Sequence, residues 1–421
     1  MIDRRSLLAD VRPLRESTDF RRLWMGYVLS QIGGQMTTFA VALQVFRITG
    51  SSVAVGAVGL AQAVPLIVVG LLGGTLIDSV DRRRLVLVTT VLAAVVSAGF
   101  AAQAFAGSGE LWLLYVLAAV QSSIAAIGGP ARRTFAPRLL RRELVPSAAA
   151  LTMVSMYIAM ISGPALAGLI AAAGGLKVCY LVDAVSFGAA LYGVSRLPSM
   201  RPQGEAAKRN LGSVLAGLRF IVTSVPLRGA LLADMSATVL AMPIALFPAI
   251  NAERFGGSPR TLGLLGTAVA VGGLSGSVLS GPVKDVVGPG RAMLVAGAVW
   301  GAALAGFGAV HGLAATLALL AVAGAADVLA VVFRSSIIQL ATPDPMRGRT
   351  SSAESVVGAG FPQLGNFRAG LVASASTPGV AAFSGGLSAV AGAGLIAAAL
   401  PAFVRYRHAE PPASCPPPDA P

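Results

Sequence analysis

Apolar stretches of about 20 residues recur along this chain, separated by short polar connections. An α-helix of that length crosses the roughly 30 Å hydrocarbon core of a bilayer. The composition agrees, because only 12% of the 421 residues are charged, against about 25% in soluble domains. The pattern predicts twelve membrane spans, at 23–46, 53–77, 84–105, 111–129, 148–172, 176–196, 227–250, 261–281, 291–310, 313–340, 352–376 and 379–404.

The basic residues predict the orientation of these spans. Most of the 32 Lys and Arg residues fall in the terminal segments and in alternate connections, and such residues are enriched on the cytoplasmic side. We therefore expect a multi-pass protein of the cytoplasmic membrane with both termini inside the cell. The outer side then receives only Arg47, Lys177, Arg254 and Arg260.

The longest polar interruption, 197–210, divides the chain nearly in half, and an amphipathic pattern over 211–225 follows it. The expected organisation is a cytoplasmic lead-in (1–22), a six-helix half (23–196), a linker with an amphipathic helix (197–226), a second six-helix half (227–404) and a disordered tail (405–421).

One short hairpin has an echo in the second half. Gly74 and Asp78 precede a run of arginines that begins with Arg82 and Arg83, between the second and third spans. Asp285 and Arg291 take the corresponding places in the second half, after Gly281. Repeated halves of this kind are typical of transporters, whose substrate site lies between the halves. We expect the hairpins to form a paired gating motif that latches and releases the inner side.

The hairpin GTLIDSVDRRR resembles the signature loop of the major facilitator superfamily, although Ser79 stands where an arginine is usual and Asp81 where a glycine is usual. The segments DFRRLWMGYVLSQIGGQM, PARRTFAPRLL and QLATPDPMRGR are similar to the enterobactin-exporter-like branch of that superfamily. The resemblance, which extends from about Asp19 to Tyr406, implies an all-α membrane protein with twelve transmembrane helices in two pseudo-symmetric halves.

The segment SGPALAG in the fifth span resembles the glycine-proline motif of drug and proton antiporters. Its members are Gly163, Pro164 and Gly168, while Ala159 and Ala167 replace glycines of that motif. Proline removes a helical hydrogen bond and small residues allow close contact, so a bend that seals one side is expected. The alternative is a kinked packing helix without a role in efflux.

Three acids fall inside predicted spans, namely Asp183, Asp234 and Asp327. An ionised Asp at the centre of a membrane helix costs about 2.5 to 3.5 kcal/mol, so each needs a partner, a cavity or a proton. They are candidates for proton coupling, with Asp327 the first choice. The alternative is a fixed structural acid paired with an arginine or capping a broken helix.

Polar side chains at membrane depth are candidates for the substrate cavity: Gln31, Gln35, Gln121, Gln363, Asn366, Arg334 and Arg368. Amides both donate and accept hydrogen bonds, which suits a large polar ligand. Their alternative role is to join helices. Arg368 either meets an anionic substrate or extends to the outer interface, and Asn366 stands where the resemblance suggests a glutamate.

These features together favour a proton-coupled transporter that exports an organic solute by alternating access. A siderophore or related metabolite is the first substrate class, and multidrug or antibiotic efflux is the alternative. A membrane-embedded enzyme is disfavoured, because the two histidines and two cysteines form no catalytic or metal-ligand pattern; a non-transporting receptor is disfavoured as well.

We expect no metal and no cofactor. The partners expected are a small-molecule substrate, protons and the lipid bilayer, and the protein is expected to be a monomer. The net charge of +14 follows membrane topology and does not indicate nucleic acid.

Overall fold

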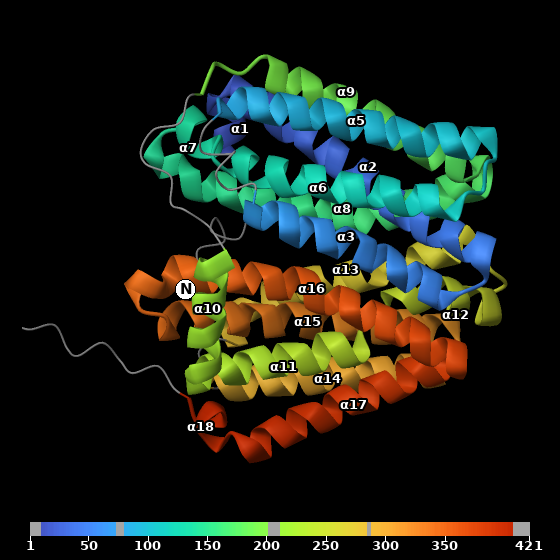
Figure 1. Cartoon of the computed structure of the whole chain (residues 1–421), viewed down its shortest axis with the longest axis vertical. Coiled ribbons are helices and arrows are strands. Elements are labelled where there is room, and N and C mark those ends of the chain that lie inside the picture. The colour runs from blue at the N-terminus through green and yellow to red at the C-terminus, as the bar shows by residue number, and fades with distance from the viewer. Residues whose placement is uncertain (1–9, 73–79, 201–210, 284–287, 407–421) are drawn as a thin grey trace, which may run out of the picture.

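The computed structural model describes residues 10–72, 80–200, 211–283 and 288–406. These residues are mostly α-helical, and no β-strand occurs among them. Figure 1 shows the helices lying side by side in two layers, with the described chain ends at the same end of the molecule.

One layer contains the helices of the first half of the chain. They are α1 (Arg12–Glu16), α2 (Thr18–Thr49), α3 (Ser52–Leu72), α5 (Arg82–Ala106), α6 (Leu111–Arg133), α7 (Ala136–Leu139), η2 (Arg142–Leu144), α8 (Val145–Gly174) and α9 (Leu176–Ser195).

The other layer contains the helices that follow residue 210. They are α10 (Leu211–Thr223), α11 (Val225–Ala241), η3 (Ile244–Leu246), α12 (Phe247–Arg254), α13 (Pro259–Val283), α14 (Pro289–Ala309), α15 (Leu313–Ala341), η4 (Asp344–Met346), α16 (Arg347–Ala375), α17 (Pro378–Ala399) and α18 (Pro401–Val404).

Local sequence explains where several of these helices begin and end. The Ser17 hydroxyl caps α2 by accepting a hydrogen bond from the Phe20 amide, and the Thr377 hydroxyl caps α17 in the same way. Gly50 ends α2 with a φ of 64°, a left-handed conformation that glycine adopts without steric cost.

Among the described residues, ten helical segments are long and apolar enough to cross a membrane. Their outward faces carry large apolar side chains that protein does not cover, such as Val185, Val278 and Leu395, each 68 to 69% exposed. Exposed apolar surface on this scale marks contact with lipid or protein. The described part of the chain is therefore built as a multi-pass membrane protein.

The seventh predicted span differs from the expectation of one continuous helix. α11 ends at Ala241, and after Met242 and Pro243 the chain continues as the short helix η3 and then α12. Proline has no amide hydrogen and fixes its φ angle, so it interrupts the helical hydrogen-bond ladder. The break leaves carbonyl groups at the end of α11 that other residues must satisfy.

The layers meet along two pairs of helices, α3 with α16 and α8 with α13. The predicted amphipathic helix is present as α10, and it packs on α16 and α11. Ile221 of α10 is buried against this layer, whereas Leu215 remains 68% exposed. An apolar side chain that protein leaves uncovered suits a helix lying at a membrane surface.

Asp81, the residue that departs from the signature loop, joins α5 to the segment that follows α9. Its carboxylate accepts hydrogen bonds from the Arg84 amide (3.0 Å), the Ser199 hydroxyl (2.6 Å) and the Met200 amide (3.0 Å). Burial alone would raise the pKa of Asp81, but these hydrogen bonds to its charged form lower it overall. Asp81 is thus both the N-cap of α5 and a link to the following connection.

We expect Asp81→Ala to lower the free energy of unfolding by about 1 kcal/mol at neutral pH, the usual contribution of an N-cap. Because the pKa of Asp81 is lower in the folded state, its stabilisation is complete above the unfolded value of about 3.9. The stabilisation is lost as the pH falls through the folded value. Melting temperatures of the purified protein at pH 7 and pH 3 measure this.

The difference in melting temperature between wild type and Asp81→Ala should shrink at pH 3. Asp19→Ala is the control, because Asp19 is an exposed first-turn acid whose ion pair with Arg22 is long, at 3.8 Å. If Asp81→Ala lowers the melting temperature no more than Asp19→Ala does, the hydrogen bonds of Asp81 do not stabilise the fold.

Candidate functional site

A charged cluster lies inside the second layer, where Arg334 of α15 contacts acids from two other helices. Its Nη1 atom is 2.5 Å from Oδ1 of Asp234 on α11, and its Nε atom is 3.8 Å from Oε1 of Glu354 on α16. The Arg334 and Asp234 side chains are only 15% and 10% exposed. A charge buried to this extent is strongly destabilising when its partner is missing. The guanidinium therefore ties α11, α15 and α16 together.

Asp327 lies on the same helix as Arg334, two turns earlier, and is partly buried. It forms no hydrogen bond or ion pair with any residue that the structure describes. Asp327 nevertheless lies close enough to interact electrostatically with Asp234 and Arg334. The Oδ2 atom of Asp234 is also buried without a hydrogen-bond partner. The site therefore holds three carboxyl groups and one guanidinium, an excess of acid over base.

Sequence reasoning did not single out Glu354. It falls at the start of the eleventh predicted span, where a charged residue is ordinary because it lies close to the polar interface. Its importance comes from α16 packing against α11, which brings its side chain to Arg334. The signal in the sequence was that Arg334 is the one arginine of the tenth span and that Glu354 begins the next span, where it can reach Arg334.

Asp183 of α9 is fully buried in a different setting, within the first layer. One of its oxygens accepts hydrogen bonds from the hydroxyls of Thr37 on α2 and Ser97 on α5, both at 2.7 Å. The other oxygen is buried without a partner, and an added Cβ at Gly33 would lie 2.5 Å from it. No basic side chain pairs with Asp183 among the described residues. It joins three helices through neutral donors and is separate from the charged cluster.

The predicted amides lie on both sides of the contact between the layers. Gln35 of α2 packs against Gly163 of α8, and Gln363 of α16 packs against Gly59 of α3. The side-chain oxygen of Gln121 on α6 is buried without a hydrogen-bond partner. Gln31 lies one turn before Gln35 on α2 and is partly buried. An amide oxygen that is buried and unsatisfied marks a place where a polar ligand or water would be stabilised.

Asn366 and Arg368 instead serve the break in the seventh span. The Asn366 side-chain oxygen accepts a hydrogen bond from the Ala245 amide at 3.2 Å, and Arg368 donates to the Leu240 carbonyl at the end of α11. Trp300 donates to the Ala237 carbonyl one turn earlier. Asn366 and Arg368 thereby satisfy backbone groups that the interrupted helix leaves open. In this structure Arg368 is therefore directed at the end of α11.

Close helix contacts join the two layers at the end of the molecule away from the described chain ends. An added Cβ at Gly168 of α8 would lie 2.6 Å from the Pro259 carbonyl oxygen, and one at Gly263 of α13 would lie 2.5 Å from that of Pro164. The pair of α3 and α16 repeats the arrangement, because an added Cβ at Gly370 would lie 2.6 Å from the Ser52 carbonyl oxygen. Only glycine permits backbones to approach so closely.

The predicted gating motif is described in part. Gly74, Asp78 and Asp285 lie outside the described residues. Arg83 donates a hydrogen bond to the Ser195 carbonyl at 2.6 Å, and the Arg82 amide donates to the Met200 carbonyl at 3.0 Å. These arginines hold α5 against the end of α9. Arg291 is exposed and forms no ion pair with another described residue.

The described residues include no group of three or more His, Cys, Asp or Glu side chains placed to hold a metal ion.

The sequence profile of the protein family described as "transmembrane secretion effector", within the major facilitator superfamily, matches residues 8–417. Among similar characterised proteins are the enterobactin exporters EntS of Citrobacter koseri and Escherichia coli. They are 27% and 26% identical over 385 residues, which cover 90% of this chain and 92% of theirs.

Solved transporter structures are similar in fold. The nucleoside transporter NupG matches with a TM-score of 0.73 at 12% identity, over 92% of this chain and 100% of its own. A bacterial homologue of the iron transporter ferroportin, solved in an inward-facing state, matches with a TM-score of 0.68 at 18% identity, over 92% and 99%. At such identities the likeness shows the fold alone.

We expect Arg334→Gln to lower the free energy of unfolding by about 3 kcal/mol, because it leaves Asp234 charged and buried without a partner. Removing both charges in Asp234→Asn/Arg334→Gln should recover most of that loss. Thermal unfolding of the purified variants in detergent measures the coupling as a double-mutant cycle. A double variant as unstable as Arg334→Gln alone would exclude the pair as the source of the effect.

Proposed function

Because the chain belongs to the transmembrane secretion effector family of the major facilitator superfamily, we propose that it exports an organic solute and uses the proton gradient to drive export. The observation that carries the proposal is the cluster of Asp234, Asp327, Arg334 and Glu354, in which acids outnumber bases. Membership of a transporter family makes the protein a transporter and not an enzyme.

The proposed topology is twelve crossings in two six-helix halves with pseudo-symmetry. Ten segments of the described chain meet both the length and the apolar requirement. α2 and α16 have 32 and 29 residues, more than the roughly 20 that a crossing needs. With the basic connections inside, both termini are cytoplasmic and the protein lies in the inner membrane, where we expect it to act as a monomer.

Proton coupling follows from the charge balance of the cluster. Arg334 neutralises Asp234 in the closed ion pair, and Glu354 lies farther away, at 3.8 Å. A proton on Asp327 or Glu354 would remove charge that the low-dielectric interior disfavours. Because Glu354 is on α16, a shift of that helix would change which acid Arg334 pairs with, and this links proton occupancy to conformation.

Alternating access is supported by the closed contacts at one end of the two layers. The glycine contacts of Gly168, Gly263 and Gly370 hold that end shut, and by the proposed topology it is the outer side. We infer that this arrangement corresponds to an inward-facing state. Opening to the outside would require α8 to separate from α13, and α3 from α16.

The proposed substrate cavity lies between the layers, next to Gln31, Gln35, Gln121 and Gln363. These amides offer donors and acceptors to a large polar solute, and the relatives named as enterobactin exporters favour a siderophore or similar metabolite. An apolar drug would use these amides poorly. Transport of dyes but not of siderophores by the reconstituted protein would favour multidrug efflux instead.

In proteoliposomes with an imposed pH gradient, Asp327→Asn should reduce proton-driven transport at least tenfold and leave counterflow exchange of substrate near the wild-type rate. The physical reason is that an amide cannot bind and release a proton, whereas exchange between equal pools needs none. Radiolabelled siderophore uptake into inverted vesicles provides both rates.

Asp344→Asn is the matched control, because Asp344 is an exposed acid paired only with Arg347 in a connection. It should keep both activities. Unchanged pH dependence in Asp327→Asn would remove Asp327 from the coupling mechanism, and a loss of exchange as large as the loss of driven transport would assign it to substrate binding.

Gly168→Ala should destabilise the closed outer side, because its methyl group would collide with the backbone of α13 at Pro259. In a background without native cysteines, a cysteine placed by Thr267→Cys reports the opening, since Thr267 lies one turn inward of Gly263 and its hydroxyl contacts the Ile161 carbonyl of α8. We expect a membrane-impermeant maleimide added outside to label this cysteine several-fold faster in the Gly168→Ala variant than in the parent with Gly168.

Gly188→Ala provides the control, because an added Cβ at Gly188 meets no other atom within 4 Å. Equal labelling rates in Gly168→Ala, Gly188→Ala and the parent would show that this contact does not hold the outer side shut.

A further inference from the structure

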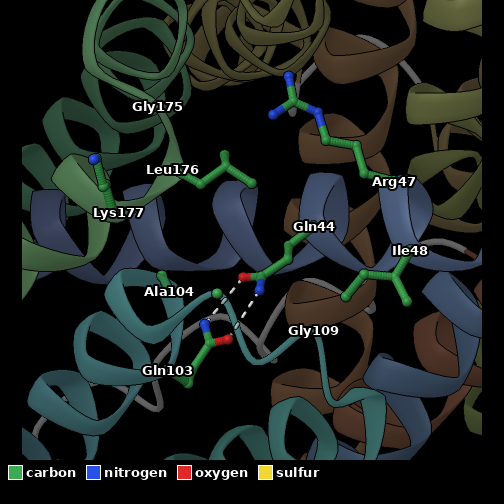
Figure 2. A pocket seen from close by; sticks show the side chains of 10 residues that line it. Gln44, Arg47, Ile48, Gln103, Ala104, Gly109, Gly175, Leu176 and Lys177 are labelled. Atoms are coloured by element: carbon green, nitrogen blue, oxygen red, sulfur yellow. Dashed lines mark hydrogen bonds between the residues drawn. The ribbon is translucent and has the colours of Figure 1, made fainter.

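A cavity of about 310 Å³ lies in the first layer, at the end of the molecule away from the described chain ends. It is separate from the charged cluster. Figure 2 shows it between the ends of α2 and α5 and the turn from α8 to α9. Apolar side chains of Ile48, Ala104 and Leu176 form part of its wall. Arg47 and Lys177 line it from two different helices, and no acidic residue does.

Its floor is a pair of amides with fixed orientation. Gln103 donates to the Phe100 carbonyl at 3.0 Å, so its nitrogen must face that carbonyl and the Gln44 oxygen. Gln44 in turn donates to the Gln103 oxygen at 2.9 Å, and Tyr180 donates to the Gln44 oxygen at 2.7 Å. Each amide nitrogen carries two hydrogens. One N–H of Gln44 is donated to Gln103, and no described residue accepts the other.

The cations of this cavity have no counter-charge among the residues that the structure describes. Neither Arg47 nor Lys177 forms an ion pair with a described acidic residue. Their position is unusual, because basic residues are rare on the outer side and two of them line one cavity. A third outer arginine, Arg254, is committed to the carbonyls of Phe307, Gly308 and Val310.

The surroundings place the cavity at the level of lipid headgroups. The Lys177 ammonium lies 5.5 Å from the centroid of the Phe105 ring, and that side chain is 55% exposed. Trp112, at the start of the next helix, is 60% exposed. Exposed aromatic rings beside cationic side chains are typical of the boundary between hydrocarbon and water.

We propose that this cavity binds an amphiphilic anion, whose phosphate or carboxylate contacts Arg47, Lys177 and the free N–H of Gln44 while its apolar part lies against Ile48 and Leu176. Two cations and an amide donor suit an oxyanion, and the apolar wall favours a ligand that also carries hydrocarbon. The anion comes either from a phospholipid of the bilayer or from a free aromatic or aliphatic acid, which the following experiment separates.

A structural explanation for Arg47 alone would be its place in the last turn of α2, where a cation interacts favourably with the helix dipole. Lys177 lies in the first turn of α9, where the dipole disfavours a cation. Dipole effects therefore do not account for the presence of both cations in this cavity.

Native mass spectrometry of the full-length protein tests the proposal with phosphatidylglycerol as the lipid probe, and titration calorimetry tests it with benzoate as the free acid. For the probe that the wild-type protein binds, we expect Arg47→Gln/Lys177→Gln to weaken the affinity of the first bound molecule at least tenfold. The charge-preserving Arg47→Lys/Lys177→Arg should bind within threefold of wild type. Arg133→Gln/Arg405→Gln removes the same net charge at the opposite end and should not change this affinity.

If Arg47→Gln/Lys177→Gln loses the binding of phosphatidylglycerol alone, the ligand is the lipid. If the same variant loses the binding of benzoate, the ligand is a free acid. Wild-type protein that binds neither probe, or an Arg47→Gln/Lys177→Gln variant that binds both as well as wild type, overturns the proposal. Equal melting temperatures of all variants in phosphatidylcholine nanodiscs verify that each one folds, so that a weakened affinity reports on the cavity.

Discussion

The structure depends on one constraint, which is that hydrocarbon offers no hydrogen-bond partners to backbone or charged groups. The broken seventh span illustrates it most directly. Pro243 interrupts the helix, and Asn366 and Arg368 from another helix satisfy groups that the break exposes. The same constraint explains why Arg334 lies beside Asp234 and why Asp183 takes two hydroxyl donors.

The two buried acidic sites solve this constraint in different ways, and the difference supports different roles. Asp183 is held by Thr37 and Ser97 within one layer, so its surroundings would stay the same if the layers moved relative to each other. The cluster around Arg334 includes Glu354, which is carried by α16, a helix that also forms the contact with α3 of the other layer. A movement between the layers therefore acts on the second site first, which is the property that a coupling site requires.

Much of the helical, multi-pass character of the fold was predictable, because membrane spans are recognised by their length and apolarity. Ten of the described segments meet both requirements, and the division into twelve spans stays a prediction. The break at Met242 and Pro243 was not predicted, because apolar residues continue through it. Hydropathy depends on side-chain type and does not report where the backbone leaves the helical conformation. The role of Asp81 was missed for a related reason. It was noted as a departure from the signature loop, while its bonds to Ser199 and Met200 depend on a connection more than 100 residues away.

The sequence by itself determined that this chain enters a membrane, which segments are helical, and that Asp183, Asp234, Asp327 and Arg334 need partners there. These conclusions follow from local composition, because the cost of a charge in hydrocarbon does not depend on the rest of the fold. Only the tertiary structure decided the partners. It joined Arg334 to Asp234 and Glu354 and turned Arg368 toward α11. It also brought Arg47 and Lys177 to one cavity. Pairing is a matter of distance between helices, and distance between helices is set by packing along their whole length.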